Sequence, residues 1–413
     1  MRSNKLFLPF IMWGVIALFY GYQYFLQVSP GVMATELMHD LQLNATELGA
    51  LAACYFYAYA GMQIPVGMLI DRFGVRKPLT GAIIIGAAGA VIFGLASNFI
   101  FTALGRLMIG FGGAFAVVSS LYIAANWLPL RYFAFLTGVT ATLGMLGASF
   151  GQSPLAWITN SFGWRHTMIA FGYCGIILAI SAWFIIRDRK TTLSAQTQQR
   201  SLIRLKSIIK NSQIWLLAIY GGLMFMPISV FGSLWGIPFL VSKYHINNTV
   251  AGTSLIGLFM GLAVGFPFFG WLSDYLKRRK IIMFVSSLGS LICITIVLYF
   301  DLSYSFTLAF LFMFGFFTGG FLVSFATARE IDRSKNTGTT MGLMNTMNMV
   351  GGAIMQPVCG LIMDLLWNGD MQNGTRIYTL QDFQIALSVI PLTIIISMVI
   401  LLWIKETHCR EIA

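Results

Sequence analysis

One arginine and several tyrosines and amides interrupt the long apolar stretches of this chain, and their chemistry suits the binding of an anionic solute. Arg106 follows the apolar segment FIFTALG and precedes LMIGFG. A second group is spaced i, i+3, i+4 and i+7, and so shares one stripe of a helix: Tyr20, Gln23, Tyr24 and Gln27. Further polar side chains in apolar stretches are Tyr55, Tyr59, Gln63, Gln152, Tyr220, Asn345, Asn348 and Gln356. A guanidinium binds carboxylates through charge-assisted hydrogen bonds. The set predicts a site for a small organic anion, or for a zwitterion such as an amino acid, a short peptide or a carboxylate-bearing siderophore.

Each of these residues also has a purely structural interpretation. Arg106 could bond to backbone carbonyls or extend to the membrane surface. Tyrosines gather at headgroup level, and amides within a membrane join neighbouring helices. A charge at this depth costs on the order of 3 kcal/mol on insertion scales, so it requires a cavity or a partner. We therefore place Arg106 first among the predicted substrate contacts.

The sequence gives little support to an enzyme or to a metal site. Ser149 lies in GASFG, which satisfies G-x-S-x-G, but this motif requires a strand, a sharp turn and a helix. Here it falls inside an apolar helical stretch. The five cysteines form no C-x-x-C pair, and the four histidines lack ligand spacing. We expect no enzymatic activity, no metal and no cofactor.

The elements that must position these residues are membrane-spanning helices. The chain is 57% hydrophobic and only 10% charged, which is not the composition of a soluble protein of 413 residues. Apolar runs of about 20 residues, long enough to cross a bilayer as helices, recur throughout. Twelve spans are predicted, near residues 6–28, 47–70, 79–97, 101–125, 134–158, 166–187, 214–239, 250–272, 281–300, 304–327, 338–365 and 382–404. The predicted fold class is an all-α membrane protein of twelve transmembrane helices in two pseudo-symmetric six-helix bundles.

The basic residues predict the orientation of the chain. With a cytoplasmic N-terminus, 22 of the 26 Lys and Arg residues fall in the termini and inward loops. The outward side keeps only Arg165, Lys243 and Arg376. This asymmetry follows the positive-inside rule, so the net charge of +12 indicates topology and not a nucleic-acid partner. We expect an integral protein of a plasma membrane or bacterial inner membrane, with both termini cytoplasmic.

A loop segment occurs twice and divides the chain into halves. GMLIDRFGVRK, residues 67–77, is echoed by GWLSDYLKRRK, residues 270–280, at an offset of 203 positions. The long polar interval lies between six spans and six spans. We predict an N-terminal bundle over 1–187, a cytoplasmic linker over 188–213 and a C-terminal bundle over 214–413. Two such repeats with a solute site between them are the plan of a transporter.

These residues resemble the major facilitator superfamily. The first loop matches that family's G-x-L-x-D-R-x-G-x-R-K motif between the second and third helices, through Gly67, Leu69, Asp71, Arg72, Gly74, Arg76 and Lys77. Arg106 with Gly110 and Gly112 resembles its R-x-x-x-G-x-G motif. The resemblance implies alternating access, with loop charges that latch the cytoplasmic gate. The alternative is that the loop charges only stop helices and anchor topology.

The predicted latches pair Asp71 with Arg131 and Asp274 with Arg333. A carboxylate at a helix end can also meet the positive N-terminus of a neighbouring helix, and Gly67 would let that helix approach. The second copy has Tyr275 and Lys277 in place of the Arg and Gly of the first, so no left-handed turn is expected there. The complete predicted gating set is Gly67, Asp71, Arg72, Gly74, Arg76, Lys77, Arg131, Gly270, Asp274, Arg279 and Arg333.

The energy source and the cargo remain open at this level. No carboxylate lies in the middle of a predicted span, so protons are a candidate coupling ion only through Glu47, His166 or Asp364. The stretches FGWRHTM and MGLMNTMNMVGGAIMQP resemble the organic-anion and amino-acid branches of the family. The predicted function is therefore secondary transport of a small organic solute by a monomer in the lipid bilayer. The alternatives are a proton-coupled exporter of drugs or metabolites, and a transporter-like receptor.

Overall fold

The computed structural model describes residues 4–129, 132–188, 211–332, 337–372 and 374–410. Within them, ten helical segments are long and apolar enough to cross a membrane, and α3 makes eleven when its two arms count as one span. A twelfth predicted span, near 134–158, is present as two shorter helices. The helical membrane architecture is therefore confirmed, and its helix order is consistent with twelve spans.

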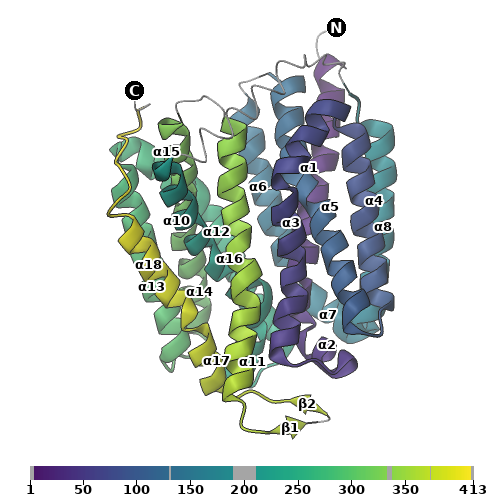
Figure 1. Ribbon diagram of the computed structural model, residues 1–413, viewed down its shortest axis with the longest axis vertical. Helices are drawn as coiled ribbons and strands as arrows, with labels where there is room; N and C mark the ends of the chain where they lie inside the picture. The colour runs from purple at the N-terminus through teal and green to yellow at the C-terminus, as the bar shows by residue number, and fades with distance from the viewer. Residues whose placement is uncertain (1–3, 130–131, 189–210, 333–336, 373, 411–413) are drawn as a thin grey trace.

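The first group of helices runs up to residue 185 and lies together on one side of the molecule (Figure 1). Its members are α1 (Asn4–Val32), α2 (Ala34–Leu41), α3 (Ala45–Phe73), α4 (Arg76–Leu95), α5 (Phe99–Trp127), α6 (Phe133–Phe150), α7 (Ser153–Phe162) and α8 (Trp164–Ile185). We call this group the first half. The predicted linker falls largely on 189–210, outside the described residues.

The remaining helices form the second half on the other side (Figure 1). They are α10 (Ser212–Pro227), η2 (Ile228–Trp235), α11 (Gly236–Tyr244), α12 (Asn248–Leu276), α13 (Arg279–Tyr299), α14 (Tyr304–Thr318), η3 (Gly319–Leu322), α15 (Val323–Ile331), α16 (Thr337–Leu366), α17 (Leu380–Leu387) and α18 (Val389–Ile400). Two short strands, β1 (Met371–Gln372) and β2 (Thr375–Arg376), form an antiparallel hairpin between α16 and α17.

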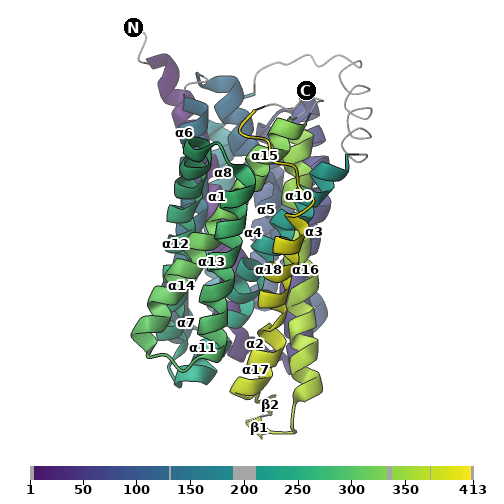
Figure 2. The same cartoon turned by 90° about the vertical axis from the view of Figure 1, so that its left-hand side faces the viewer.

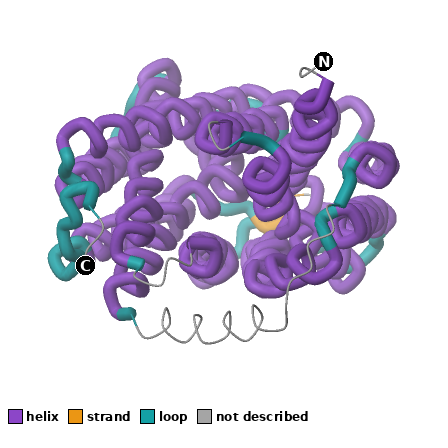
Figure 3. Tube along the Cα trace, turned by 90° about the horizontal axis from the view of Figure 1, so that it is seen from above, coloured by secondary structure: helices purple, strands orange, loops and turns teal. Residues whose placement is uncertain are grey.

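The two ends of the bundle are easily told apart. Both chain termini lie at one end, which we call the terminal end, and the β1–β2 hairpin, α2 and α17 lie at the other, which we call the hairpin end (Figures 1 and 2). Viewed down from the terminal end, the helices appear nearly end-on (Figure 3). At the centre, α3 and α16 lie side by side and antiparallel (Figure 1). The C-terminus of each therefore lies beside the N-terminus of the other.

Proline residues lie where three of the long helical segments deviate from a regular α-helix. Helix α3 bends by 53° between Gln63 and Pro65, because proline removes a backbone donor and its ring crowds the preceding turn. The fifth predicted span breaks between α6 and α7, where Pro154 begins the new helix. In the seventh, the π-helix η2 follows Pro227 directly. Such breaks occur in membranes only where other groups satisfy the freed backbone.

Candidate substrate site and gates

A cluster of tyrosines and amides from α1, α3 and α16 lies within the bundle. Tyr20 donates to the Tyr24 hydroxyl at 3.4 Å, and Tyr55 donates to Oε1 of Gln23. Asn345 of α16 donates from Nδ2 to Oε1 of Gln63 at 2.9 Å, which joins the two halves. The Tyr59 ring packs against that of Tyr55, with the ring centroids 5.7 Å apart. The structure thus brings seven of these polar residues together: Tyr20, Gln23, Tyr24, Tyr55, Tyr59, Gln63 and Asn345.

Two amide donors in this cluster have no partner. Nε2 of Gln23 and Nε2 of Gln63 are buried and donate to no acceptor in the described part of the chain. A buried donor without a partner costs about 1–3 kcal/mol. These amides belong to side chains whose oxygens are already occupied, so a ligand that supplies oxygen acceptors would satisfy both. Gln63 continues the Tyr55 and Tyr59 stripe at helical spacing.

Arg106 lies beside this cluster and is fully buried. Its Nη1 donates to the carbonyl of Leu26 at 2.7 Å, and its Nη2 donates to those of Gln27 and Ala52 at 3.3 and 3.4 Å. The guanidinium carbon lies 5.2 Å from the centre of the Tyr55 ring. Arg106 therefore ties α5 to α1 and α3 in this conformation, and a direct contact with a substrate carboxylate stays a prediction.

Pro30 explains why a carbonyl of α1 needs the arginine. A proline within a helix has no N–H for the carbonyl four residues earlier, and that carbonyl belongs to Leu26. Arg106 and the hydroxyl of Ser29, at 2.9 Å, donate to it instead. In a membrane interior, where water is excluded, this replacement stabilises the proline-containing helix.

The glycines after Arg106 let α5 pass close to two neighbours. A Cβ at Gly110 would overlap the carbonyl of Tyr55 on α3, and one at Gly112 would lie 2.6 Å from the carbonyl of Ala82 on α4. Small residues allow such close backbone approach between membrane helices. The glycine motif therefore sets the position of Arg106 against α3.

We expect Gly110→Ala to lower the stability of the purified protein by about 1–3 kcal/mol or more, because the added methyl forces α5 away from α3. Gly138→Ala on α6 is the matched control, since nothing lies within 4 Å of a Cβ there. Thermal unfolding of both variants in the same detergent provides the measurement. Equal melting temperatures for the two would contradict the packing role of Gly110.

Gln152 and Gln356 lie toward the hairpin end and bond to the irregular helix η2. Nε2 of Gln356 donates to the carbonyl of Ser229 at 2.7 Å, and Nε2 of Gln152, from the other half, donates to that of Gly232 at 3.2 Å. These amides satisfy carbonyls of the π-helical segment. They are thus separated from the tyrosine cluster and lie where the two halves meet.

The remaining predicted contacts face the interior of their own halves. Tyr220 donates to the carbonyl of Met283 on α13 and contacts the Ser287 hydroxyl, both at 3.1 Å. Asn348 is buried near Gly221 of α10. For Gln27, the described contact is its backbone carbonyl with Arg106. The structure therefore does not bring Tyr220 or Gln27 side chains into the hydrogen bonds of the cluster.

Asp364 closes the hairpin end between the halves. From the C-terminal turn of α16, its carboxylate accepts hydrogen bonds from the N–H groups of Ala45 and Thr46 at 3.4 and 2.8 Å, and from the Thr46 hydroxyl at 2.5 Å. Tyr378 donates to it at 2.5 Å, and Arg376 pairs with it at 3.0 Å. A carboxylate at the N-terminus of α3 is favoured by the helix dipole as well as by these donors.

The space around the glycines shows that the two halves pack more closely at the hairpin end than at the terminal end. At the hairpin end, a Cβ at Gly49 would lie 2.5 Å from the carbonyl of Gln356, and one at Gly252 would lie 2.8 Å from the backbone of Ser153. Both contacts cross between the halves. Toward the terminal end of the same helices, Gly67 and Gly270 have nothing within 4 Å. The halves are therefore pressed together at the hairpin end, while the glycines toward the terminal end stand open.

The first loop is held within its own half. Asp188, just after α8, accepts from the N–H groups of Val75 and Arg76 at 2.7 and 3.0 Å and so caps the start of α4. Gly74 has φ of +78° and no room for a side chain, because a Cβ would meet the Asp188 carboxylate. The Arg76 side chain donates to the carbonyl of Trp183 at 2.8 Å. Gly74 and Arg76 thus shape the loop and fix it to α8.

The second loop repeats this cap with different residues. Glu406 accepts from the N–H groups of Arg279 and Lys280 at 2.8 and 2.9 Å, which caps α13. Arg279 itself pairs with Asp274 at 2.7 Å and with Glu330 at 2.6 Å. Lys277 has φ of +52°, so the expectation that the altered copy lacks a left-handed residue is wrong. The backbone turn persists although glycine is gone, because the cap and the ion pairs stabilise it.

Glu406 gives the second loop a dependence on pH. Burial alone would raise the pKa of Glu406, but the N–H donors of Arg279, Lys280 and His408 outweigh it and hold the pKa below the usual 4.5. A lowered folded-state pKa contributes stability above the unfolded value, and this is lost as pH falls through the folded value. We expect Glu406→Gln to destabilise the protein by about 1 kcal/mol at neutral pH. Melting curves recorded down the acid range should converge below pH 4.5, and a gap that persists unchanged at acid pH would argue against this cap.

Several predicted gating and coupling residues cannot be placed in a latch. Arg131 and Arg333 lie outside the described residues, so the pairs Asp71–Arg131 and Asp274–Arg333 stay predictions. Asp71, Arg72 and Lys77 are exposed at the terminal end. Glu47 forms a capping box with Asn44 at the start of α3, and His166 is exposed. The caps made by Asp188 and Glu406 were missed, although each acid lies within two residues of the end of a predicted span.

The described residues contain no group of three or more His, Cys, Asp or Glu side chains that could hold a metal. The Ser149 hydroxyl donates to the carbonyl of Met145 in its own helix. Two helical halves around a buried polar cluster are the plan of a secondary transporter.

Comparison with known proteins identifies the family. The profile of the Major Facilitator Superfamily matches residues 11–356, and the chain belongs to that superfamily. The chain is 24% identical over 309 residues to the probable galactarate/D-glucarate transporter GarP of Escherichia coli (strain K12). The aligned region covers 65% of this chain and 68% of that protein. The chain is 22% identical over 357 residues to the hexuronate transporter of Bacillus subtilis (strain 168), covering 81% and 83%.

A third relative matches over a shorter length. The chain is 26% identical over 186 residues to the probable sulfoacetate transporter SauU of Cupriavidus necator, covering 45% of this chain and 43% of that protein. The chain thus spans less than half of that relative. Among solved structures, a bacterial homolog to the human lysosomal transporter Spinster, in an inward-facing and occupied conformation, superposes with a TM-score of 0.77 at 17% identity over 96% of both chains. This likeness shows the fold.

Proposed function

We propose that this protein is a secondary transporter of a small organic anion, with a hydroxylated carboxylate as the preferred cargo. The observation that carries the proposal is the pair of unpartnered amide donors, Gln23 and Gln63, among tyrosine hydroxyls. Arg106 lies beside them without a carboxylate partner among the described residues and supplies positive potential. Relatives named for galactarate, glucarate and hexuronate transport support this chemistry.

The distribution of charge and the contacts between the halves support an orientation and a conformational state. We take the terminal end as cytoplasmic, because the Lys and Arg residues of the sequence concentrate there. The close contacts between halves then seal the outer side, and the conformation is inward-facing. Of the hydrogen bonds between described residues of the two halves, Asn345–Gln63 lies nearest the cytoplasmic side. A substrate leaving toward the cytoplasm would have to separate this pair.

The α3–α16 pair supplies the gating mechanism. Because these helices are antiparallel, Asp364 near the end of α16 lies at the N-terminus of α3, at the outer end. Asp71 near the end of α3 correspondingly lies on the side of the N-terminus of α16, at the inner end. The outer latch is closed here, and Asp71 has no ion pair with a described residue. Rocking of the halves would break one carboxylate–helix contact as the other forms, which is alternating access.

The direct test is ligand-induced thermal stabilisation of the purified protein by galactarate, glucuronate and sulfoacetate. Each is compared with a neutral polyol, galactitol being the matched partner of galactarate. A binder stabilises the folded state according to its concentration relative to Kd, so we expect the anions alone to raise Tm. Equal stabilisation by galactitol would contradict the proposal that the site prefers an organic anion.

We expect Gln23→Leu combined with Gln63→Leu to weaken anion binding by roughly 10-fold or more. Each substitution removes a buried amide N–H that would donate a hydrogen bond to the ligand. Gln381→Leu, on an exposed face of α17, is the control. Binding is followed by thermal shift, and counterflow in proteoliposomes tests transport. Binding without counterflow would favour a receptor over a transporter, and full affinity in the double variant would place the site elsewhere.

A further inference from the structure

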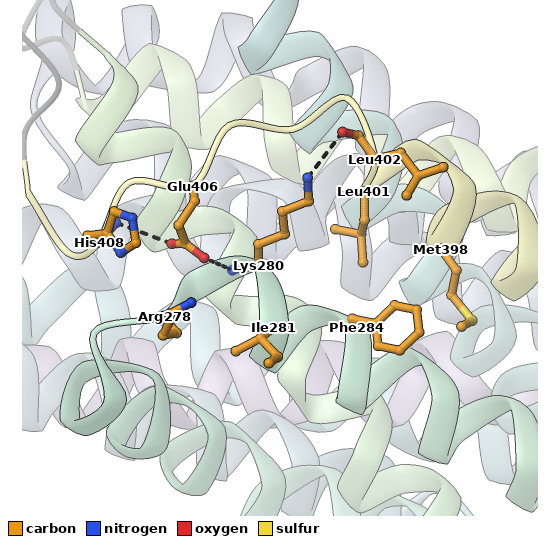
Figure 4. Close-up of a pocket in the computed structure, with 9 residues that line it drawn as sticks. All are labelled: Arg278, Lys280, Ile281, Phe284, Met398, Leu401, Leu402, Glu406 and His408. Carbon is orange, nitrogen blue, oxygen red and sulfur yellow. Dashed lines mark hydrogen bonds between the residues drawn. The ribbon is translucent and has the colours of Figure 1, made fainter.

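A second polar site lies at the terminal end of the second half, away from the tyrosine cluster. It is a pocket of about 430 Å³ between the start of α13 and the end of α18. We call it the basic pocket, and its lining residues are Arg278, Lys280, Ile281, Phe284, Met398, Leu401, Leu402, Glu406 and His408. Figure 4 shows these side chains together. None of them belongs to the predicted substrate set.

The lining is arranged from charged to apolar. In Figure 4, Arg278, Glu406 and His408 lie at one side, and Phe284, Met398 and Leu402 lie at the other. The apolar residues are open to the surroundings: Ile281 and Phe284 of α13 are 51% and 42% exposed, and Leu402, just after α18, is 70% exposed. Exposed apolar side chains on a membrane-spanning helix face lipid tails. The basic pocket therefore joins a cationic head region to a surface that acyl chains cover.

The free charge in the pocket is positive. Glu406 is occupied by the N–H groups of Arg279, Lys280 and His408. Lys280 uses one donor on the carbonyl of Leu402 at 3.1 Å, which leaves its other two ammonium protons available. Arg278 is exposed. The two cations, Arg278 and Lys280, outnumber the single carboxylate of Glu406, whose oxygens are already hydrogen-bonded. The pocket therefore attracts an anion at the level of the lipid headgroups.

We propose that the basic pocket binds an anionic phospholipid, with its phosphate between Arg278 and Lys280 and an acyl chain along Phe284 and Leu402. Basic pockets between transmembrane helices recognise such headgroups. Because Glu406 and Lys280 tie α13 to the segment after α18, an occupying lipid holds these helices together. The proposal needs only membrane insertion, so it is independent of the transported solute.

The test uses the full chain purified in an uncharged detergent. Phosphatidylglycerol, phosphatidylcholine and inorganic phosphate are added separately, and both Tm and lipid retained in native mass spectrometry are recorded. We expect phosphatidylglycerol to bind and stabilise more than phosphatidylcholine. Stabilisation by phosphate alone, or equal binding of both lipids, would overturn the proposal.

The variant Arg278→Gln with Lys280→Gln should weaken phosphatidylglycerol retention by roughly 20-fold, because each cation near a headgroup contributes about fivefold. The charge-matched control is Arg72→Gln with Lys77→Gln, two exposed cations at the terminal end of the other half. Retained lipid is counted directly, so the result stands even if the variant melts earlier. Unchanged retention in the first variant, or an equal loss in the control, would refute the site.

Discussion

Asp364→Ala is expected to release the hairpin end and to lower transport by at least tenfold. The substitution removes two hydrogen bonds that Asp364 accepts across the halves, from the N–H and the hydroxyl of Thr46. It also removes the ion pair with Arg376 within the second half. Hydrogen bonds to charged groups contribute about 1.5–3 kcal/mol each. Losing two of them would shift the equilibrium between closed and open outer gates by on the order of 100-fold or more.

Spin labels at Ser97 and Ser303, which are exposed on opposite halves at the hairpin end, report this opening as a longer distance. The matched control is Asp301→Ala, an exposed carboxylate at the same end without a cross-half hydrogen bond among the described residues. Asp364→Asn should give an intermediate distance distribution, because the amide oxygen still accepts while the charge is gone. An unchanged distance in Asp364→Ala would eliminate the outer latch.

The second large effect concerns Arg106 and Pro30. We expect Arg106→Met to destabilise the protein by about 3 kcal/mol or more, because the carbonyls of Leu26, Gln27 and Ala52 lose their donor in a buried region. In a Pro30→Ala background the loss should be smaller. Alanine at position 30 restores an N–H for the Leu26 carbonyl, so the arginine is needed less.

A double-mutant cycle in thermal or denaturant unfolding measures this coupling. The same four proteins are then compared for anion binding. If Arg106 acts only on the helix backbone, binding by Arg106→Met should recover in the Pro30→Ala background. If it contacts the substrate carboxylate, binding stays weak in both backgrounds, and a coupling energy near zero would refute the link to Pro30.

Much of the candidate site was readable from spacing. The stripe formed by Tyr20, Gln23 and Tyr24 was identified from helical periodicity, and it does meet Tyr55 of α3. Spacing cannot say which helix a stripe faces. Tyr220 is likewise a tyrosine in an apolar helix, but its hydroxyl donates to a carbonyl of α13. Gln152 and Gln356 donate to carbonyls of the π-helix η2. Gln152 and Gln356 thus satisfy carbonyls that the irregular helix η2 leaves free.

By itself, the sequence determined the helical membrane architecture, the repeated loop and the family, because apolar run length and short charged motifs are local properties. In the structure, Pro30 lies within α1 and leaves the carbonyl of Leu26 without its helical donor. Only the tertiary structure decided that Arg106, 80 positions away along the chain, supplies the missing donor. It likewise decided that Asp364 caps α3, since both depend on which helix ends pack side by side, and that is settled by the whole bundle.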